Sequence, residues 1–472
     1  MLNRFDTYQE FKLSFYKKVT DFSVFDCGEV NLLKVVLDGL KVDYLSLGAY
    51  RTPLFYSEVV FKAYCFAQRM RLRSFAKTRT AIADQLRKYS GAKVLFVASY
   101  DLQTDEGVTS RYFNSFMKLL DREDYTALHC VSVPKAPAGD VEVSIIRRYL
   151  QTLPLDDRER ELYHNLRGTY AAIETAGYFD SEELGNIRIA FNNFFEEYRA
   201  YHFLLQHINP KVAIFRCHYH KEGMIHALKQ NHIKCIELQH GLIAKEDIFY
   251  IFPDVIKAFR DRALFADRIW VYGNYWKSVL NHGAEYPENL TDVIGYYHYL
   301  EVARKPVDPE LQSFISKRKV VLLASQTGSH ELFIRYSRWM AAKQRVLDEN
   351  WAILLKPHPN EDPALFASVT ELTNIRICTA PIDDLLPLAD AVISIYSTVL
   401  FDAKRYNKDC YSLYYKKYDD YIRSFVDSGV SELLNEHELP DLESRGTVRH
   451  DFSYFYEKFD SRLVHQLIHA NL

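Results

Sequence analysis

Short apolar runs alternate with helical stretches from about residue 94 onwards. In the first half of the chain, the runs that we assign as strands are Val94–Ser99, Thr126–Val133, Val212–Phe215 and Ile233–Leu238. The segments between them carry apolar residues at helical spacing. Short apolar runs separated in this way are typical of buried strands in a parallel sheet. The pattern therefore predicts a Rossmann-like α/β domain in this half.

The same alternation returns in the second half. Its expected strands are Arg268–Tyr272, Lys319–Ser325, Ile353–Leu355, Ala391–Ile395 and Cys410–Leu413. Because the two halves repeat each other coarsely, we expect two α/β domains, a number that also suits a chain of 472 residues. We expect a helical N-terminal extension at residues 1–90 and a first Rossmann-like domain at 91–262. A second Rossmann-like domain is expected at 263–445, followed by a C-terminal helix at 446–472.

Composition narrows the class of protein. The net charge is −3, so the chain has no overall basic signature for nucleic acid. The seven cysteines follow no ligand pattern, which indicates reduced thiols in a cytoplasmic protein and argues against structural zinc. No apolar run reaches the ~18 residues of a membrane-spanning helix. We therefore expect a cytoplasmic protein that is soluble or peripheral to the membrane.

Residues 62–93 are rich in basic side chains, with aromatic residues between them. Such a segment can lie on an anionic membrane surface, here the inner face of the cytoplasmic membrane. The alternative is a solvated helix face that packs on its own domain. The sequence leaves both interpretations open.

Polar residues that suit an anionic group follow the strands of the second half. Ligands of open α/β sheets bind at the carboxyl ends of the strands. There a lysine, a histidine and the N–H groups of a helix start can all bind phosphate. Each feature alone is commonly a loop residue or a helix cap, but two of them lie one β-α-β unit apart, which favours a ligand site. The expected donor-binding residues are Lys356, His358, Ser394, Ser397, Thr398, Gln326 and Thr327.

Histidines and a lysine follow two strands of the first half. His218, His220 and Lys221 come after Val212–Phe215, and His240 lies in the string Gln239-His240-Gly241 after the next strand. Since polar groups again gather at strand ends, both halves point functional groups the same way. The spacing of these loop residues does not match a metal-binding helix motif, so we expect no metal.

An acidic loop follows the first strand of the first half. It contains Asp101, Asp105 and Glu106, with Gly107 next. A carboxylate at this position is well placed to face a cleft. It can equally provide the negative charge that a helix N-terminus favours.

Several strings resemble a known group of enzymes. IKCIELQHGLI, RIWVYGNYWKSVL, DVIGYYHYLE, VVLLASQTGS, LLKPHPNE and ISIYSTVLFDA together resemble bacterial GT-B glycosyltransferases of capsule and lipopolysaccharide assembly. The similarity extends over roughly residues 92–440. It is to polysialyltransferases, other nonulosonate or Kdo transferases, and CDP-glycerol glycerophosphotransferases.

The resemblance implies a fold and a set of roles. The fold would be GT-B, in which two Rossmann-like domains face each other across a cleft and the C-terminal one binds the nucleotide donor. His358 of the His-Pro motif, with Ser397 and Thr398, would contact the donor phosphate. Asp105 and Glu106 resemble in type the acidic pair of polysialyltransferases, in which a carboxylate is the base. The Gln239-His240-Gly241 string lies near the cleft in this group without one agreed role, and we take His240 as a further candidate catalytic residue.

We therefore expect a glycosyltransferase that uses a nucleotide-sugar donor and acts on a hydroxyl of a surface polysaccharide or glycolipid. Fixed donors would stabilise the leaving phosphate, and a carboxylate or histidine would deprotonate the acceptor. Lysine, histidine and helix ends would replace a metal, so no cofactor is expected. A single compact phosphate clamp favours a CMP-activated nonulosonate or Kdo. The alternatives are CDP-glycerol or CDP-ribitol polyol-phosphate transfer, a UDP-sugar epimerase, and a non-catalytic binding partner.

Overall fold

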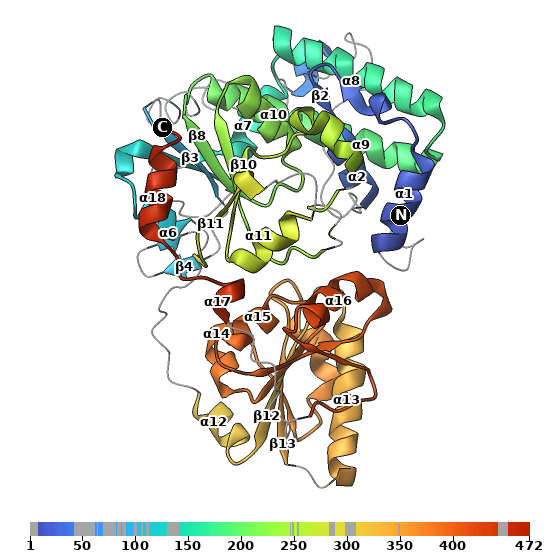
Figure 1. The fold of residues 1–472 in the computed structure, drawn as a ribbon, viewed down its shortest axis with the longest axis vertical. Helices are drawn as coiled ribbons and strands as arrows, with labels where there is room; N and C mark the ends of the chain where they lie inside the picture. The colour runs from blue at the N-terminus through green and yellow to red at the C-terminus, as the bar shows by residue number, and fades with distance from the viewer. Residues whose placement is uncertain are drawn as a thin grey trace.

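The structure is a computed structural model with two α/β domains, and both termini belong to the upper one in Figure 1. It describes residues 8–41, 62–63, 65–68, 82, 86, 91–98, 102–104, 107–109, 113–129, 141–245, 247, 250–252, 254–282, 288–297, 308–347, 350–441 and 452–472. Within these ranges, no helix is both long and apolar enough to cross a membrane.

The first domain is built on a seven-stranded sheet with the order β11-β10-β9-β8-β3-β6-β7. All neighbouring strands pair in parallel. The strands are β3 (Val94–Ala98), β6 (Tyr125–His129), β7 (Val141–Glu142), β8 (Val212–Arg216), β9 (Lys234–Leu238), β10 (Arg268–Val271) and β11 (Thr291–Val293). The chain starts in the middle of the sheet, so the strand order reverses between β3 and β8. That reversal is the position where α/β sheets bind ligands.

Helices pack on this sheet, and their buried side chains join those of the strands in the hydrophobic core of the domain. The main ones are α6 (Asn114–Met117), α7 (Val143–Leu150), α8 (Asp157–Ala176), α9 (Ser181–Leu205), α10 (Glu222–Gln230) and α11 (Asn274–Leu280), with 3-10 turns at Arg122–Asp124, Asp254–Arg262 and Glu288–Leu290. Both α8 and α9 begin with a capping box, Asp156 with Glu159 and Asp180 with Glu183. The reciprocal bonds satisfy N–H groups that a helix start leaves unpaired, which fixes where these long helices begin.

The second domain repeats the plan with a six-stranded parallel sheet of order β14-β13-β12-β15-β16-β17. Its strands are β12 (Lys319–Ala324), β13 (Trp351–Lys356), β14 (Ile375–Ile377), β15 (Ala391–Ser394), β16 (Asp409–Leu413) and β17 (Glu432–Leu434). Its helices are α12 (Pro309–Ile315), α13 (His330–Leu347), α14 (Ile382–Leu385), α15 (Val399–Lys404) and α16 (Asp419–Asp427), with 3-10 turns at Pro363–Val369, Leu386–Leu388 and Lys416–Tyr418. Here the order reverses between β12 and β15. The predicted fold, two Rossmann-like domains in a GT-B arrangement, is confirmed.

The expected domain boundary at residue 263 is wrong. β10 pairs with β9, and β11 pairs with β10, so residues 268–293 complete the first sheet. An apolar run indicates a buried strand but not the sheet in which it pairs, because pairing depends on distant contacts. The first domain therefore continues to residue 297, and the second begins at 308.

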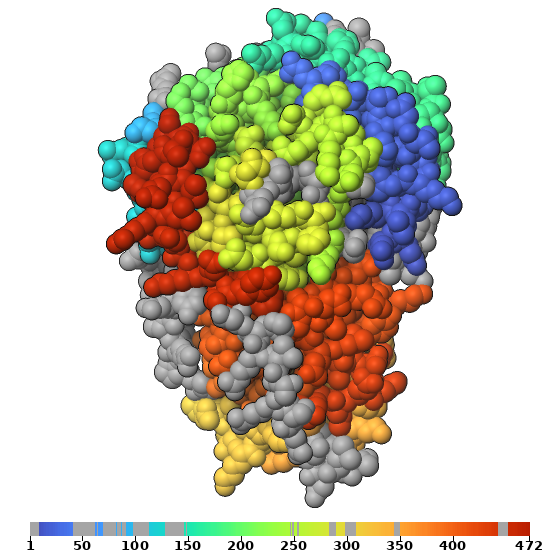
Figure 2. Space-filling view, viewed as in Figure 1, coloured from blue at the N-terminus to red at the C-terminus, as the bar shows by residue number. Residues whose placement is uncertain are grey.

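The C-terminal segment returns to the first domain, where the space-filling view shows it in red on the outer surface (Figure 2). It forms two helices, α17 (Phe452–Phe455) and α18 (Ser461–His469), where one helix was expected. The Trp276 indole N–H donates to the Phe455 carbonyl at 2.7 Å, and the Tyr296 N–H donates to that of Glu457 at 2.8 Å. Gly295, with a φ of +86°, lies so close to Lys458 that a Cβ there would clash with its carbonyl group.

The N-terminal extension is helical where the structure describes it. It consists of α1 (Tyr8–Lys18), a 3-10 turn at Phe22–Phe25, a short hairpin of β1 (Asp26–Cys27) and β2 (Val30–Asn31), and α2 (Leu33–Lys41). Phe11 and Phe15 of α1 are buried in the hydrophobic core of the first domain, which also contains side chains of α8 and α9. The extension is therefore a structural part of that domain.

Candidate functional site

The loops at the carboxyl edge of the second sheet are tied together where the strand order reverses. Gln326, after β12, accepts the Tyr396 N–H on its side-chain oxygen at 3.0 Å, which joins it to the loop after β15. Ser394 is fully buried and donates to the Ala324 carbonyl at 2.7 Å. These two predicted donor-binding residues therefore shape the site, and the Ser394 side chain is not exposed to a ligand.

His358 has a defined protonation state in this site. The Asn360 N–H donates to its Nδ1 at 3.1 Å, and the Thr327 hydroxyl lies 3.0 Å from the same atom. Because a backbone N–H can only donate, Nδ1 is an acceptor and the proton of the neutral ring is on Nε2. Burial lowers the pKa of His358, and nearby Lys356 lowers it further, against the opposing effect of Glu361. The ring is thus a neutral donor with its Nε2–H unused by any described residue.

Lys356 supplies a cation beside this histidine. Its ammonium group donates to the Pro357 carbonyl at 3.3 Å and is half-buried, and burial lowers its pKa. A half-buried lysine attracts an anion more strongly than a fully solvated one, because less water screens the charge. Thr327 and His358 are thus in contact, and the Lys356 charge acts on the same ring. We treat the three residues as one polar cluster, and its binding of a donor stays a prediction.

Glu361 connects the loops beneath this cluster and was missed by the sequence analysis. Its carboxylate accepts the Ser325 hydroxyl at 2.5 Å and the Gly328 N–H at 3.2 Å. Ser325 in turn accepts the His358 N–H at 2.9 Å. The available signal was an acid three residues after His358 in the string HPNED. Glu361 is buried, and a buried carboxylate needs hydrogen-bond partners. Its partners join the loop after β12 to the loop after β13.

Ser397 and Thr398 precede α15, as predicted. Both are half-buried, and the Ser397 hydroxyl accepts the Val399 N–H at 3.3 Å, whereas the Thr398 side chain makes no capping bond at the helix start. The helix is only six residues long. Its dipole therefore contributes less than the sequence pattern suggested, and the hydroxyls remain the polar groups on this side of the site.

The first sheet holds a buried ionic group at its own reversal point. His218 Nδ1 lies 2.8 Å from the Glu237 carboxylate, which also accepts the Tyr250 hydroxyl at 2.7 Å. Burial raises the pKa of Glu237, but these two partners outweigh it and bring the pKa to about 2. Burial lowers the pKa of His218. His218 is almost inaccessible to solvent, so it supports the loop rather than lining an open surface.

Helix α2 holds the adjoining residues of the same loop. The His220 N–H donates to Asp38 at 3.1 Å, and the His220 ring nitrogen Nδ1 lies 3.4 Å from the same carboxylate oxygen. Lys34, one turn earlier on α2, pairs with the buried Glu222 at 3.4 Å. The Lys221 ammonium donates to the Cys217 carbonyl at 2.7 Å. Of the predicted group His218, His220 and Lys221, His220 is thus held by an element that the sequence pattern placed in an extension, whereas His218 and Lys221 bond to Glu237 and to the Cys217 carbonyl.

His240 is presented by a fixed turn. The Gln239 side chain donates to the Gly241 carbonyl at 2.9 Å and accepts the Tyr272 N–H at 2.9 Å. Burial lowers the pKa of His240 to about 4, so the ring is neutral at physiological pH. Its Nδ1 is buried without a hydrogen-bond partner among the described residues. A neutral imidazole of this kind can accept a proton from a nearby hydroxyl.

Aromatic rings pack beside each of the two groups of loops. On the first domain, Tyr219, after β8, contacts the His240 ring with centroids 5.5 Å apart. Burial holds the pKa of Tyr219 well above its usual value. On the second domain, Tyr421 packs on Tyr396, in the loop after β15, with centroids 5.1 Å apart.

Asp101, Asp105 and Glu106 lie outside the described residues, so their expected role stays a prediction. The strands on either side, β4 (Leu102–Thr104) and β5 (Gly107–Thr109), pair antiparallel with Thr104 opposite Gly107. Most of the basic segment 62–93 also lies outside the described residues.

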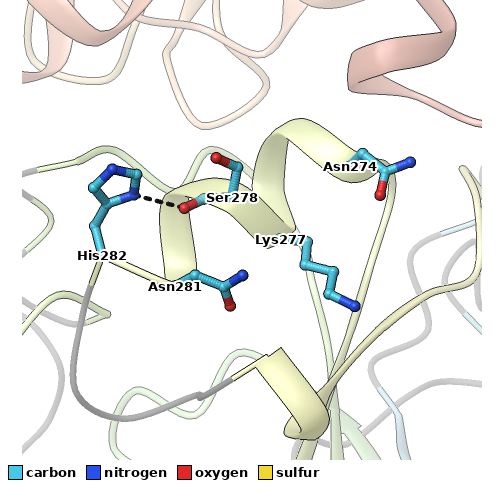
Figure 3. A pocket seen from close by; sticks show the side chains of 5 residues that line it. All are labelled: Asn274, Lys277, Ser278, Asn281 and His282. Carbon is cyan, nitrogen blue, oxygen red and sulfur yellow. Dashed lines mark hydrogen bonds between the residues drawn. The ribbon is translucent and has the colours of Figure 1, made fainter.

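A separate hollow of about 330 Å³ opens beside α11. It is lined by polar side chains of α11 and of the two residues that follow it: Asn274, Lys277, Ser278, Asn281 and His282 (Figure 3). The His282 ring donates to the Ser278 carbonyl at 2.7 Å. None of the predicted site residues lines it.

Comparison with known proteins gives distant structural likenesses only. No protein-family model matches the chain, and neither does any curated protein. A UDP-GlcNAc 2-epimerase from Methanocaldococcus jannaschii, solved with UDP-GlcNAc and UDP, is 12% identical, with 80% of this chain and 99% of that chain covered and a TM-score of 0.49. A glycosyltransferase from Rickettsia africae is 12% identical, covering 81% and 99%, with a TM-score of 0.42. The wall teichoic acid polymerase TagF, soaked with CDPG, is 14% identical, covering 90% and 98%, with a TM-score of 0.42. Likenesses this distant identify neither a reaction nor a substrate.

Proposed function

We propose that this protein is a glycosyltransferase that moves a sugar from a nucleotide donor to a hydroxyl of a glycan or glycolipid acceptor. The observation that carries the proposal is the cluster of Lys356, His358 and Thr327 at the reversal point of the second sheet. It combines a half-buried ammonium group with an imidazole whose Nε2–H is available to a ligand. Such groups suit a phosphate at the place where Rossmann sheets bind nucleotides.

The chemistry follows from the charges that develop during transfer. The bond between the anomeric carbon and the donor phosphate oxygen breaks, and its electron pair leaves with the phosphate. The acceptor oxygen forms the new bond to carbon, and its proton passes to a base. Lys356 and the His358 Nε2–H would stabilise the leaving phosphate without reorganising, since both are already held in place. On the first domain, His240 is our candidate for the base, because its ring is neutral and its Nδ1 has no hydrogen-bond partner among the described residues.

The donor that we favour is a CMP-activated nonulosonate or Kdo, because the cluster is compact and CMP-sugars carry one phosphate. The acceptor would be a bacterial surface polysaccharide. CDP-glycerol or CDP-ribitol transfer remains the alternative on the same site, since a CDP donor needs the same kind of phosphate contacts. No metal or organic cofactor enters this proposal.

Nucleotide-dependent stabilisation tests the donor site directly. Thermal unfolding is measured with CMP, CDP, UDP, GDP and their sugar conjugates, each with and without EDTA. A ligand at about 100 times its Kd that binds only the native state stabilises it by about 2.7 kcal/mol. We expect CMP to raise the Tm of the wild type and to lose this effect in His358→Ala. An exposed histidine of the same domain provides the matched control, His437→Ala, which should respond like the wild type.

Each other outcome changes the conclusion. A stronger response to CDP moves the proposal to polyol-phosphate transfer, and a response to UDP moves it to an epimerase or a hexosyltransferase. No response to any nucleotide refutes a nucleotide-dependent enzyme. If His240→Asn keeps the CMP response but loses turnover, His240 is confirmed on the reacting side. If turnover persists, the base is elsewhere, with Asp105 and Glu106 the next residues to test.

Membrane contact through residues 62–93 is a further part of the proposal. Neutralising Arg69, Arg71 and Arg73 should reduce co-sedimentation with anionic vesicles and leave binding to neutral vesicles unchanged. Equal co-sedimentation of the variant and the wild type would remove the membrane from the proposal.

A further inference from the structure

Two exposed histidines lie side by side on the last helix of the chain. α18 is amphipathic: Val464 and Ile468 are fully buried, whereas His465 and His469 are exposed. Residues four apart on a helix lie on the same face, one turn above the other. The Nε2 atoms of the two rings are 3.1 Å apart, and the ring centroids are 4.2 Å apart. The two ring nitrogens therefore face each other across one turn of the helix.

That separation fits the geometry of a metal chelate. With metal–nitrogen bonds of about 2.05 Å, nitrogens at this spacing subtend an angle of about 98° at a shared ion. The value lies between the ~90° of square-planar coordination and the ~109° of tetrahedral coordination. Without an ion, the contact requires one Nε2–H to donate to the other Nε2 lone pair. An ion would instead use both lone pairs, which requires the two side chains to turn but leaves the helix backbone in place.

We propose that His465 and His469 bind one divalent transition-metal ion of the Cu²⁺, Ni²⁺ and Zn²⁺ class. Neutral imidazole is the ligand that these ions share, and Cu²⁺ binds such a pair most tightly. Among the residues that the structure describes, no group of three potential ligands gathers at one point. Water would therefore complete the coordination. The expectation of no metal was based on the cysteines and the loop histidines. His465 and His469 were not considered there, and two histidines four residues apart on a helix are a spacing that metal sites use.

The site is independent of the proposed transferase reaction. α18 lies along the lateral surface of the first domain (Figure 1), and neither histidine belongs to the proposed donor site. Chelation would join two successive turns of a helix whose buried face packs on that domain. Binding requires both rings to be unprotonated, so it should weaken as the solution is made acidic.

Copper titration of the untagged full-length protein tests the proposal. Cu²⁺ binding is measured by isothermal titration calorimetry, and the coordination is read from the nitrogen splittings in the electron paramagnetic resonance spectrum. We expect one site well above the background of the other histidines, with two equatorial nitrogens. His465→Ala and His469→Ala should each weaken it at least tenfold and leave one nitrogen. Gln466→Ala, an exposed substitution on the same helix, should leave both measurements unchanged.

Two results would overturn the site. One is a wild-type affinity no higher than that of either single variant, which would reduce the pair to a hydrogen-bonded contact on a helix surface. The other is a tight site whose spectrum is the same in all four proteins, which would place the ion on other residues. Because both histidines are exposed, neither substitution is expected to change the fold, and circular dichroism checks this.

Discussion

Removing the Glu361 carboxylate should destabilise the donor side of the second domain. The group is about nine-tenths buried and accepts the Ser325 hydroxyl and the Gly328 N–H. A hydrogen bond to a charged group contributes about 1.5–3 kcal/mol, and leaving a buried donor unsatisfied has a similar cost. Glu361→Ala should therefore lower local stability by about 3 kcal/mol. Glu361→Gln keeps the shape and one acceptor, so about half that loss is expected.

The assay must separate the two domains, because a chain of this size need not unfold in one step. Hydrogen–deuterium exchange of peptides that cover β12 and β13 under increasing urea gives the stability of the affected loops. Peptides from β8 and β9 report the first domain, where no change is expected. Glu310→Ala, at an exposed surface ion pair with Arg376, provides the control and should change stability by less than about 0.5 kcal/mol. A loss below about 1 kcal/mol for Glu361→Ala would refute its role in joining the loops.

Two further predictions concern the first domain. Gly223→Ala should lower the free energy of unfolding by about 1–3 kcal/mol or more, because the added Cβ would lie 2.3 Å from the Phe194 carbonyl oxygen. Urea unfolding measures this loss. The control is Gly168→Ala, which should raise stability slightly, because its Cβ would meet no atom within 4 Å. Glu197→Gln should flatten the pH dependence of stability, because burial raises the Glu197 pKa from 4.5 to about 7. The folded state thus holds this proton more tightly than the unfolded chain, and stability falls by up to about 3 kcal/mol as the pH rises from 4.5 to 7. The variant should therefore gain most above pH 7 in urea titrations at pH 5 and pH 8, and an equal effect at both would contradict the assignment.

The inner strands of both sheets were predictable because buried parallel strands are apolar on both faces, so their signal is local. The short edge strands β7, β11, β14 and β17 were not predicted. Val94–Ala98 and Ala391–Ser394 both appear as continuous apolar runs. Sheet membership was not predictable in this way. Arg268–Val271 has the same pattern as the strands of either sheet, and only its pairing with Lys234–Leu238 assigns it to the first.

The structure brings some of the predicted site residues together, and it gives others a structural role that the sequence did not indicate. That the residues bind a donor stays a prediction. His358 and Thr327 come together as expected, because both follow neighbouring strands of one parallel sheet. Ser394 was misjudged because a hydroxyl at a strand end can bond either to a ligand or to the adjacent strand. Glu361 and Asp38 act through partners that are distant along the chain or in another element, so no local pattern identifies them.

The return of the C-terminal segment means that the second domain is inserted into the first. Residues 297 and 452 both belong to the first domain, and residues 308–441 lie between them. The second domain is therefore attached by two covalent crossings of the boundary. Any separation of the two domains therefore has to move both crossings together, whereas a domain on a single crossing would have to move only one. Cleavage of the chain between residues 441 and 452 would leave one connection and would cut no strand of either sheet.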